Sequence, residues 1–513
     1  MHRFTSKVLC LLTLTLPAVC NWAHAAACAV PSIGYATIQA AINDPGCSPI
    51  NVAAGTFNEA LSINRTLTLS GSGANTILNA PSNSAAISLA TGANNVVLQN
   101  FALKANGGNG IALTGGSISN LTISGVAASG TDNQNESGLF VGTTATITTL
   151  NVSNSSFNDF GYGWYFAKAV SADASNVSNV TANGLDIIGN AFKGLYIEKL
   201  TNASFTSSRF NDNGLSPSVF NSRVNGGIDI NLKAGAYQNL SFNNVEVVGN
   251  AVSGTDGTVQ LCPGTGGFCQ GFGIWLKARS DPAAYNTFPA TLTGVSITNS
   301  LISNNQRGVL VGDLAASAPN VPFFFPGPSN VTITNNRIIN NVPTFVSVPT
   351  MAFPQVKTPN SNMPLFGGVI VYTAAAATAT INITRNDLSG NAGGTFPTFV
   401  YGSVSGWGAF NDPAANAATG ILPSGCNFWG ATTGAGGVAG GGGTVTSPQV
   451  DFSAPLVTAN LNGVCGADPA SAFPTVPTLS AALLGALLML MIAAAHVAAQ
   501  RALPSMGQRK TSC

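Results

Sequence analysis

The segment NVVLQNFALKANGGNGIAL, Asn95–Leu113, contains both phrases that recur along this chain. It begins with asparagine followed by an apolar, a usually polar and an apolar residue, and it ends with glycine, apolar, any and apolar residues. Alternation over four positions predicts a short half-buried strand, and Asn and Gly predict the turns between strands. A repeating unit of two such strands indicates one coil of a solenoid rather than a layer of a globular domain.

Both phrases return at intervals that suit one coil. The step from Asn95 to Asn120 is 25 residues. Asparagines at equivalent positions of successive coils can form a hydrogen-bonded ladder along the axis. Several also begin Asn-X-Ser/Thr sequons, which are glycosylation acceptors in a suitable host. We favour the ladder, because the Ser or Thr is simply an outward strand position. The glycine phrase begins at Gly110, Gly138, Gly194, Gly227, Gly273, Gly308 and Gly368.

Charged residues are scarce: they make up 7% of the chain, against about a quarter in ordinary domains. The net charge of +1 provides no basic field, so we expect no nucleic-acid partner. Val, Ile, Leu and Phe nevertheless recur with strand periodicity, which argues against a disordered chain. Asn, Ser and Thr fill the polar positions, so amides and hydroxyls should form most of the surface.

Residues 1–25 have the pattern of a secretory signal peptide. Arg3 and Lys7 precede an apolar run at 8–19, and small residues follow it. The run is too short to span a bilayer as a helix. The sequence therefore predicts export.

Export makes disulfide bonds possible for the remaining cysteines. Segment 26–465 contains no histidine, so we expect disulfides rather than a metal site, and no cofactor. A lipid-modified Cys28 is the alternative for the first cysteine. The order of cysteines along the chain suggests the pairs Cys28–Cys47, Cys262–Cys269 and Cys426–Cys465.

The opening of the chain contains Thr37-Ile-Gln-Ala-Ala-Ile42, Val52-Ala-Ala-Gly-Thr-Phe57 and Leu67-Thr-Leu-Ser-Gly71. These segments resemble the entry segment of the pectin-lyase-like family. The resemblance implies an all-β fold, a single-stranded right-handed parallel β-helix solenoid over residues 26–465. Ile38, Ala41 and Ile42 share a face of a short helix that would cover the first coil.

The closing phrase Gly425-Cys-Asn-Phe-Trp-Gly430 is similar to the end of many bacterial β-helix repeat proteins. Trp429 is expected to cover the open end of the core. A role of this indole in sugar binding is the alternative.

The C-terminal residues differ from the repeat array. Residues 466–475 read as a linker, and 476–513 contain a short motif, an apolar stretch at 481–499 and a basic tail. The stretch is long enough for one transmembrane helix, with a cytoplasmic C-terminus. The motif residues are Val476, Pro477, Thr478, Leu479 and Ser480. Motif, apolar stretch and basic tail together resemble the IPTL-CTERM class of sorting signals, which implies an exosortase-type protease. A plain membrane anchor is the alternative.

Alignment of the glycine phrases assigns a direction to each strand residue. Inward positions are apolar, and the positions between them point outward. Coils lie about 4.8 Å apart, so outward residues of neighbouring coils should be stacked. Aromatic and charged residues concentrate there. One outward row is expected to contain Tyr165, Tyr196, Asp229 and Trp275, and the next row Glu198, Asn231 and Lys277.

These seven residues form the candidate ligand site. Aromatic rings stack on sugars, and charged groups bind hydroxyls or uronates, so a carbohydrate-facing groove is one interpretation. The other is an outer ladder with a surface ion pair that contributes about 0–1 kcal/mol.

For catalysis, Asp229 and Glu198 supply the two carboxylates that glycoside hydrolysis needs, assisted by Asp186 or Asp313. Lys277 or Arg279 is the candidate base of a lyase.

The sequence as a whole favours an exported bacterial cell-surface protein, anchored in the membrane by its C-terminal helix or released by processing. We expect it to be non-catalytic and to present an extended face for adhesion or glycan binding. A polysaccharide hydrolase or lyase is the alternative.

Overall fold

The computed structural model describes residues 28–466, apart from 134, 172, 215–223, 252–260, 263–266, 269, 281–284, 306, 313, 316–322, 325–326, 342–366, 374, 392–406, 412–420, 438 and 447–449. The predicted signal peptide, sorting motif and 481–499 helix lie outside these residues, as does Cys269 of the predicted Cys262–Cys269 bridge. Within the described ranges, no helix has the length and apolar character needed to cross a bilayer.

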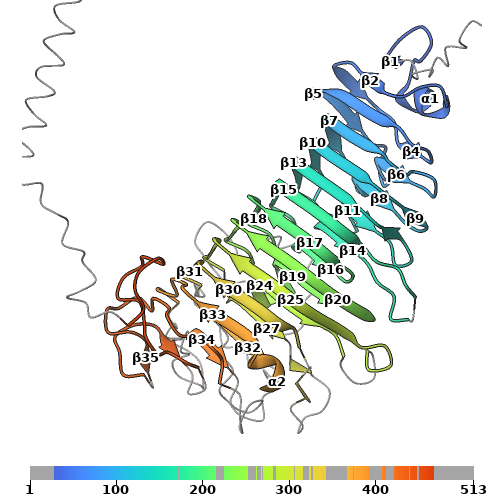
Figure 1. Ribbon diagram of the computed structural model, residues 1–513. Helices are drawn as coiled ribbons and strands as arrows, with labels where there is room; N and C mark the ends of the chain where they lie inside the picture. The colour runs from blue at the N-terminus through green and yellow to red at the C-terminus, as the bar shows by residue number, and fades with distance from the viewer. Residues whose placement is uncertain are drawn as a thin grey trace, which may run out of the picture.

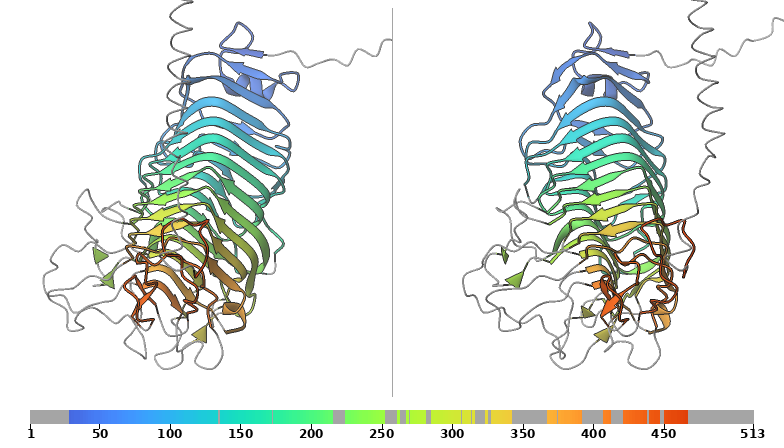
Figure 2. Two further views of the ribbon diagram at one scale, coloured as in Figure 1. Left: turned by 60° about the vertical axis from the view of Figure 1, so that its left-hand side comes forward. Right: turned by 90° about the vertical axis from the view of Figure 1, so that its left-hand side faces the viewer.

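The described chain is a parallel β-helix, as the repeated phrases predicted. A 17-stranded sheet and a 13-stranded sheet, here sheet A and sheet B, run along its length, and every pairing within them is parallel (Figure 1). Each coil contributes strands to both sheets, so the coils lie one above another (Figure 2). The few helices and the parallel ladders agree with the expected all-β class.

Sheet A contains β1 (Cys28–Val30), β2 (Ile50–Val52), β3 (Gly55–Phe57), β5 (Thr68–Asn79), β7 (Val97–Lys104), β10 (Leu121–Ser129), β13 (Leu150–Asn158), β15 (Ser178–Ile188), β17 (Thr201–Thr206), β18 (Arg209–Asn211), β20 (Gly235–Asn243), β21 (Glu246–Val248), β25 (Ala290–Thr298), β26 (Leu301–Ser303), β30 (Ser329–Thr334), β31 (Arg337–Ile339) and β33 (Ile381–Thr384). Sheet B contains β4 (Leu61–Ile63), β6 (Ile87–Leu89), β8 (Ile111–Leu113), β11 (Ser137–Val141), β14 (Tyr162–Phe166), β16 (Lys193–Ile197), β19 (Val224–Leu232), β24 (Gln270–Ala278), β27 (Arg307–Gly312), β32 (Gly367–Tyr372), β34 (Trp407–Asn411), β35 (Gly436–Gly437) and β36 (Val445–Thr446). The remaining elements are helices α1 (Ile38–Asn43) and α2 (Ala375–Thr378) and the small pairs β9 (Ser117–Ile118) with β12 (Thr146–Ile147), β22 (Leu261–Cys262) with β23 (Gly267–Phe268), and β28 (Leu314–Ala315) with β29 (Phe323–Phe324).

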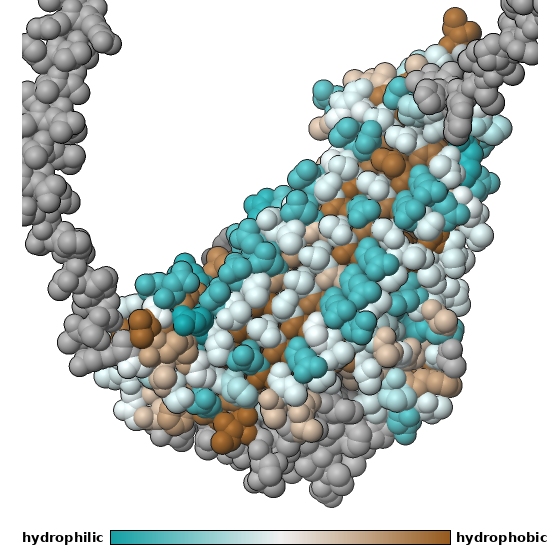
Figure 3. All heavy atoms as spheres, in the orientation of Figure 1, coloured by the Kyte–Doolittle hydropathy of each residue, from teal (hydrophilic) through white to brown (hydrophobic). Residues whose placement is uncertain are grey.

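The interior of the solenoid is one continuous apolar core. In sheet A, Val152 pairs with Ile123 on one side and with Ala182 on the other, and all three are buried. The alternation of the sequence thus places each apolar residue above its equivalent in the previous coil. On the face shown in Figure 3, most residues are of intermediate hydropathy, with hydrophilic residues in separate patches and apolar residues between them.

Asparagine ladders join the coils. The exposed ladder predicted from the repeated phrase is present: Asn120 Nδ2 donates to Asn95 Oδ1 at 2.7 Å, and Asn239 Nδ2 donates to Asn202 Oδ1 at 3.0 Å. Their backbones are left-handed, a conformation that Asn tolerates better than most residues. The sequon residues therefore have a structural role that is independent of glycosylation.

A second, fully buried ladder was not predicted. Asn250 Oδ1 accepts from the backbone and side-chain nitrogens of Asn213, both at 3.0 Å, and Asn250 Nδ2 donates to Asn305 Oδ1 at 3.0 Å. In the sequence, each ladder asparagine directly follows a Gly, Asn or Asp, and that preceding residue has a left-handed backbone in the structure. The ladder runs through Asn190, Asn213, Asn250, Asn305, Asn341 and Asn391.

Close contact between coils explains the repeated glycines. A Cβ atom on Gly227 would lie 2.8 Å from the carbonyl oxygen of Gly273 and 3.0 Å from Nδ2 of Asn250. The same carbonyl contact recurs from Gly110 to Gly308. The glycine phrase therefore marks where sheet B passes the buried asparagine ladder.

The N-terminal end is covered by α1, close to the predicted 37–42 helix. The hydroxyl of Thr37 caps α1 by accepting from the backbone nitrogen of Ala40 at 3.1 Å. Gln39 closes the free edge of β4: its side-chain amide donates to Ser62 O at 3.1 Å and accepts from Ser62 N at 2.7 Å. The predicted Cys28–Cys47 disulfide is present, so Cys28 is not the lipid-modified cysteine of the alternative hypothesis.

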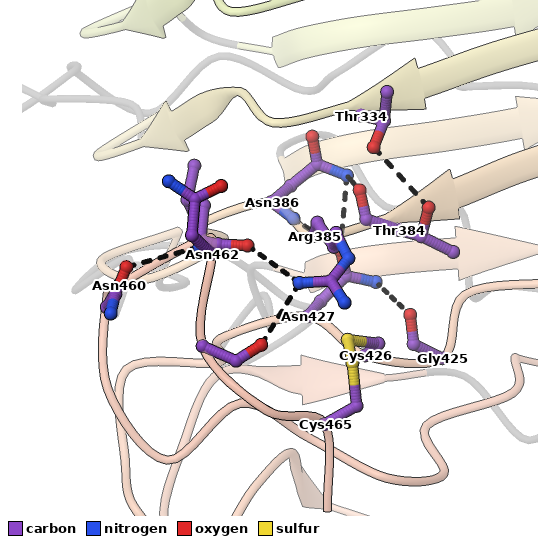
Figure 4. Close-up of a disulfide and its surroundings, with 12 residues drawn as sticks. Thr334, Thr384, Arg385, Asn386, Gly425, Cys426, Asn427, Asn460, Asn462 and Cys465 are labelled. Atoms are coloured by element: carbon purple, nitrogen blue, oxygen red, sulfur yellow. Dashed lines mark hydrogen bonds between the residues drawn. A yellow bond between two sulfur atoms is a disulfide. The ribbon is translucent and has the colours of Figure 1, made fainter. Parts of the chain in front are cut away.

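The C-terminal end is closed by the segment that follows β36. Trp429 is fully buried in the core, as expected, which leaves its indole no access to a sugar. Arg385 donates through Nη1 to the carbonyl oxygens of Leu461 and Gly463, at 3.1 and 3.0 Å. The predicted Cys426–Cys465 disulfide lies beside these contacts (Figure 4).

Candidate functional site

The candidate site lies on the outer face of sheet B. Tyr165 on β14 pairs with Tyr196 on β16, Tyr196 with Asp229 on β19, and Asp229 with Trp275 on β24. Asn231 pairs with Lys277 in the adjacent row. The predicted stacking order of both rows is therefore confirmed for these pairs. The order could be read from the sequence because the glycine phrase fixes the register of each strand.

Both interpretations of the outer rows, an open groove and a ladder with a surface ion pair, are wrong about the exposure of the charged residues. Asp229, Glu198, Lys277, Asn231 and Trp275 are all buried. They point away from the solenoid core, but they pack against one another outside it. A separate apolar cluster continues the outer face toward β32 and consists of Phe272, Trp275, Leu310, Ile370 and Tyr372.

Asp229 lies between two lysines. Its Oδ2 accepts from Lys193 Nζ at 2.7 Å, and its Oδ1 lies 2.9 Å from Lys277 Nζ. The Lys277 contact has the distance of an ion pair but not the angles of a hydrogen bond. Each ammonium also lies over an aromatic ring, Lys193 at 3.8 Å from the centre of Tyr196 and Lys277 at 3.6 Å from that of Trp275.

Lys193 was not among the predicted site residues. It precedes the outward row by three positions, and its register partner in the next coil is Gly226. Because glycine has no side chain, the lysine stem can extend over that strand to Asp229. The sequence signal that could have identified Lys193 is a lysine whose partner in the next coil is a glycine, in a chain with few charged residues.

The two lysines keep Asp229 ionised. Burial alone raises the pKa of the Asp229 carboxyl, but the ammonium groups of Lys193 and Lys277 outweigh this, and the net pKa is below its usual range. Burial lowers the pKa of Lys193, and the attraction of Asp229 only partly compensates. The group is thus a buried salt bridge without a transferable proton on its carboxyl.

A pH dependence follows from the lowered pKa of Asp229. In the unfolded chain this carboxyl titrates at about 3.9, so the folded state binds fewer protons near that pH. The stabilisation is complete above this value and is lost as the pH falls through the lower folded pKa. We expect the difference in unfolding free energy between the natural protein and Asp229→Asn to stay constant from about pH 7 to 5 and to shrink below about pH 4. Urea titrations across this range test it; an unchanged difference at low pH would contradict it.

Glu198 is also engaged. Its Oε1 accepts from Lys233 Nζ, and its Oε2 accepts from the backbone nitrogen of Lys168 at 2.9 Å. Asn231 donates through Nδ2 to the Tyr196 hydroxyl at 3.3 Å and accepts from Arg279 Nη1 at 3.2 Å. Polar side chains on or directly after β16, β19 and β24 therefore form a network of such pairs. Lys233 was also missed by sequence reasoning.

Tyrosines border this network. Tyr162, Tyr165 and Tyr196 are partly exposed. The rings of Tyr165 and Tyr196 stack with centres 4.9 Å apart and planes at 22°. Stacked rings cover each other's faces, which differs from the open ring faces expected for sugar stacking. Burial raises the pKa of Tyr162 to about 12 and raises the pKa values of the other two, so all three are neutral.

The remaining charged candidates lie elsewhere. Asp186 pairs with Arg209 at 2.7 Å on sheet A, so it cannot assist Asp229. Asp313 lies outside the described residues. Lys199, directly after Glu198, donates to the carbonyl oxygens of Gly142 and Ala145 at 2.7 and 2.6 Å. Burial, and then the ammonium of Lys168, lower the pKa of Lys199 to about 7.

Comparison with known proteins adds fold-level similarities. No family model and no curated protein matches the sequence. Among solved structures, the chain is similar to the A-module of the mannuronan C-5 epimerase AlgE4 of Azotobacter vinelandii, with 13% identity over 66% of this chain and 87% of that chain, and a TM-score of 0.34. The A-module of AlgE6 from the same organism gives 11% identity over 66% and 84% of the two chains, with a TM-score of 0.30.

A further match is the catalytic domain of a GH87 α-1,3-glucanase in complex with tetrasaccharides. It shows 14% identity over 72% of this chain and 70% of that chain, with a TM-score of 0.30. These neighbours are polysaccharide-active enzymes by name.

Proposed function

We propose that this protein binds a polysaccharide on the outer face of sheet B, at the row formed by Tyr162, Tyr165 and Tyr196. The observation that supports this most directly is the partial exposure of three stacked tyrosines in a surface made mainly of short polar residues. The ion network beside them holds the row in place, since the ammonium of Lys193 lies over the ring of Tyr196.

The free hydroxyls supply the contacts. Across the part of the chain that the structure describes, the hydroxyls of Tyr162 and Tyr165 form no hydrogen bond within the protein. A phenol hydroxyl both donates and accepts, which suits the hydroxyl groups of a sugar. Lys233 and Arg279 lie beyond Tyr196 and border the same face.

Binding to a glycan array tests this function. A net hydrogen bond contributes about 0.5–1.5 kcal/mol, so a Tyr162→Phe/Tyr165→Phe double variant should bind about tenfold more weakly. Phenylalanine retains the stacking, so the fold should be preserved. Tyr35→Phe, in the N-terminal cap, is the control and should bind normally. Equal binding by the double variant, or no binding of any glycan by the natural protein, would refute the proposal.

A polysaccharide hydrolase or lyase is the second candidate. It is favoured by the position of Glu198, directly after β16, and Asp229, on β19, around Tyr196. Burial raises the pKa of Tyr196, and both carboxylates raise it further. Both carboxylates are held by lysines, so catalysis by them requires these ion pairs to open during substrate binding.

Incubation with plant and bacterial polysaccharides, followed by assays of reducing ends and unsaturated products, separates the two candidates. Product formation that is lost in Glu198→Gln would establish the enzyme. Binding without product would leave the non-catalytic function.

We also propose that the protein is exported and held at the membrane by its 481–499 segment, with exosortase-type processing at Val476–Ser480. The pattern of the terminal sequences supports this. Replacement of Pro477 and Thr478 should leave unprocessed, membrane-bound protein. Identical size and fractionation of the natural protein and this variant would instead indicate a plain anchor.

A further inference from the structure

The stacked tyrosines have a geometry that sugar binding does not require. Tyr165 and Tyr196 are register partners on neighbouring parallel strands, β14 and β16. Their ring centres are 4.9 Å apart and their planes are nearly parallel, at 22°. Tyr162 lies 5.3 Å from Tyr165 and 5.6 Å from Tyr196. The sheet therefore holds three phenols in contact, each from a position fixed by backbone pairing.

We propose that Tyr165 and Tyr196 form an intramolecular dityrosine cross-link when the protein meets a one-electron oxidant. Each phenol gives one electron to the oxidant and one proton to a base or to solvent, which produces two phenoxyl radicals. A bond forms between the ring carbons ortho to the two hydroxyls. The ring hydrogens at these carbons then move to the phenol oxygens, so the product lacks two hydrogen atoms relative to the reactants.

Proximity makes this pair the preferred site. A reaction between groups held in contact avoids the entropic cost of bringing them together, which can correspond to very large effective concentrations. Partial exposure of both rings allows the oxidant to take an electron at the surface. Among the ring pairs of the described residues, Tyr35, Tyr237 and Tyr285 have no tyrosine partner.

Each of the two phenols also has an acceptor for the proton that it loses on oxidation. The Tyr165 hydroxyl forms no hydrogen bond within the described residues and can release its proton to solvent. The carboxylate of Glu198 lies near the Tyr196 hydroxyl, where it adds to the rise in pKa caused by burial. A phenol that is neutral must lose its proton on oxidation, and Glu198 is placed to accept it.

The cross-link would tie two adjacent coils covalently. Tyr165 and Tyr196 are separated by one coil of chain, so the bond would close a loop that contains β15. Closure of such a loop restricts the unfolded chain in the way a disulfide does. An oxidant at the surface would therefore stabilise the coils that carry the tyrosine row.

The test is photo-oxidation of the full chain with tris-bipyridine ruthenium(III) and persulfate. The monomer should gain dityrosine fluorescence and lose the mass of two hydrogen atoms. Peptide mapping with fragmentation should join Tyr165 of the β14 peptide to Tyr196 of the β16 peptide. Tyr165→Phe and Tyr196→Phe should each abolish this link, and Tyr162→Phe and Tyr285→Phe should retain it.

Two results would overturn the proposal. One is oxidation of tyrosines without a link between Tyr165 and Tyr196, including a link that joins Tyr196 to Tyr162 instead. The other is dityrosine found only between molecules. Circular dichroism of each variant before oxidation shows whether the fold is retained. If a variant does not fold, peptide mapping of the natural protein alone still identifies which two tyrosines are linked.

Discussion

Replacement of Asp229 by asparagine is expected to lower the free energy of unfolding by about 3–5 kcal/mol, the usual cost of removing one partner from a buried ion pair. The reason is that Lys193 and Lys277 are buried and would lose the carboxylate that compensates their charges. Urea unfolding of the purified protein measures the loss. Hydrogen exchange of β16, β19 and β24 should show increased local opening, since these strands carry the three residues.

The chain contains a matched control for this experiment. Asp186 and Arg209 form an ion pair with two hydrogen bonds of 2.7 Å, but Arg209 is half-exposed and Asp186 is partly exposed. Asp186→Asn should therefore cost only about 0–1 kcal/mol. The triple change Lys193→Met/Asp229→Leu/Lys277→Met should cost much less than Asp229→Asn, because it removes the charges together. Equal losses for Asp186→Asn and Asp229→Asn would contradict the buried network.

Replacement of Asn250 by alanine should have a comparable effect. Asn250 accepts from the backbone nitrogen of Asn213 and donates to the carbonyl oxygen of Phe210 at 2.8 Å. Each buried polar group left without a partner costs about 1–3 kcal/mol, so the loss should be at least about 2 kcal/mol. The Asn250→Ala change also removes the side-chain link between Asn213 and Asn305 in the ladder.

Asn151→Ala is the control for the ladder. Asn151 is an exposed residue of β13 with no side-chain hydrogen bond among the described residues, so the change should stay within about 0.5 kcal/mol. Thermal unfolding of both variants compares them directly. A midpoint for Asn250→Ala equal to that of Asn151→Ala would show that the ladder is not a determinant of stability.

The candidate site was only half predictable from the sequence. The glycine phrase fixed the register, and register alone placed Tyr165, Tyr196, Asp229 and Trp275 in one row. The partners were not predictable in the same way. Lys193 belongs to a different row, and its long side chain crosses Gly226 to reach Asp229. Strand periodicity predicts which way a side chain points and in which coil it lies, but not the path that a long, flexible side chain takes.

The sequence by itself determined the solenoid. A period-2 pattern repeated with Asn and Gly turns gives short strands whose apolar residues one repeat cannot bury alone, so the coils stack around a common core. It also determined the capping helix and two disulfides, which depend on local patterns and chain order. Only the tertiary structure decided that the charged outer residues are buried. It also decided that two lysines pair with the ionised carboxylate of Asp229, which is therefore not available as a free catalytic group. Burial and ion pairing depend on which side chains of several coils meet, and that information is not contained in the pattern of any single coil.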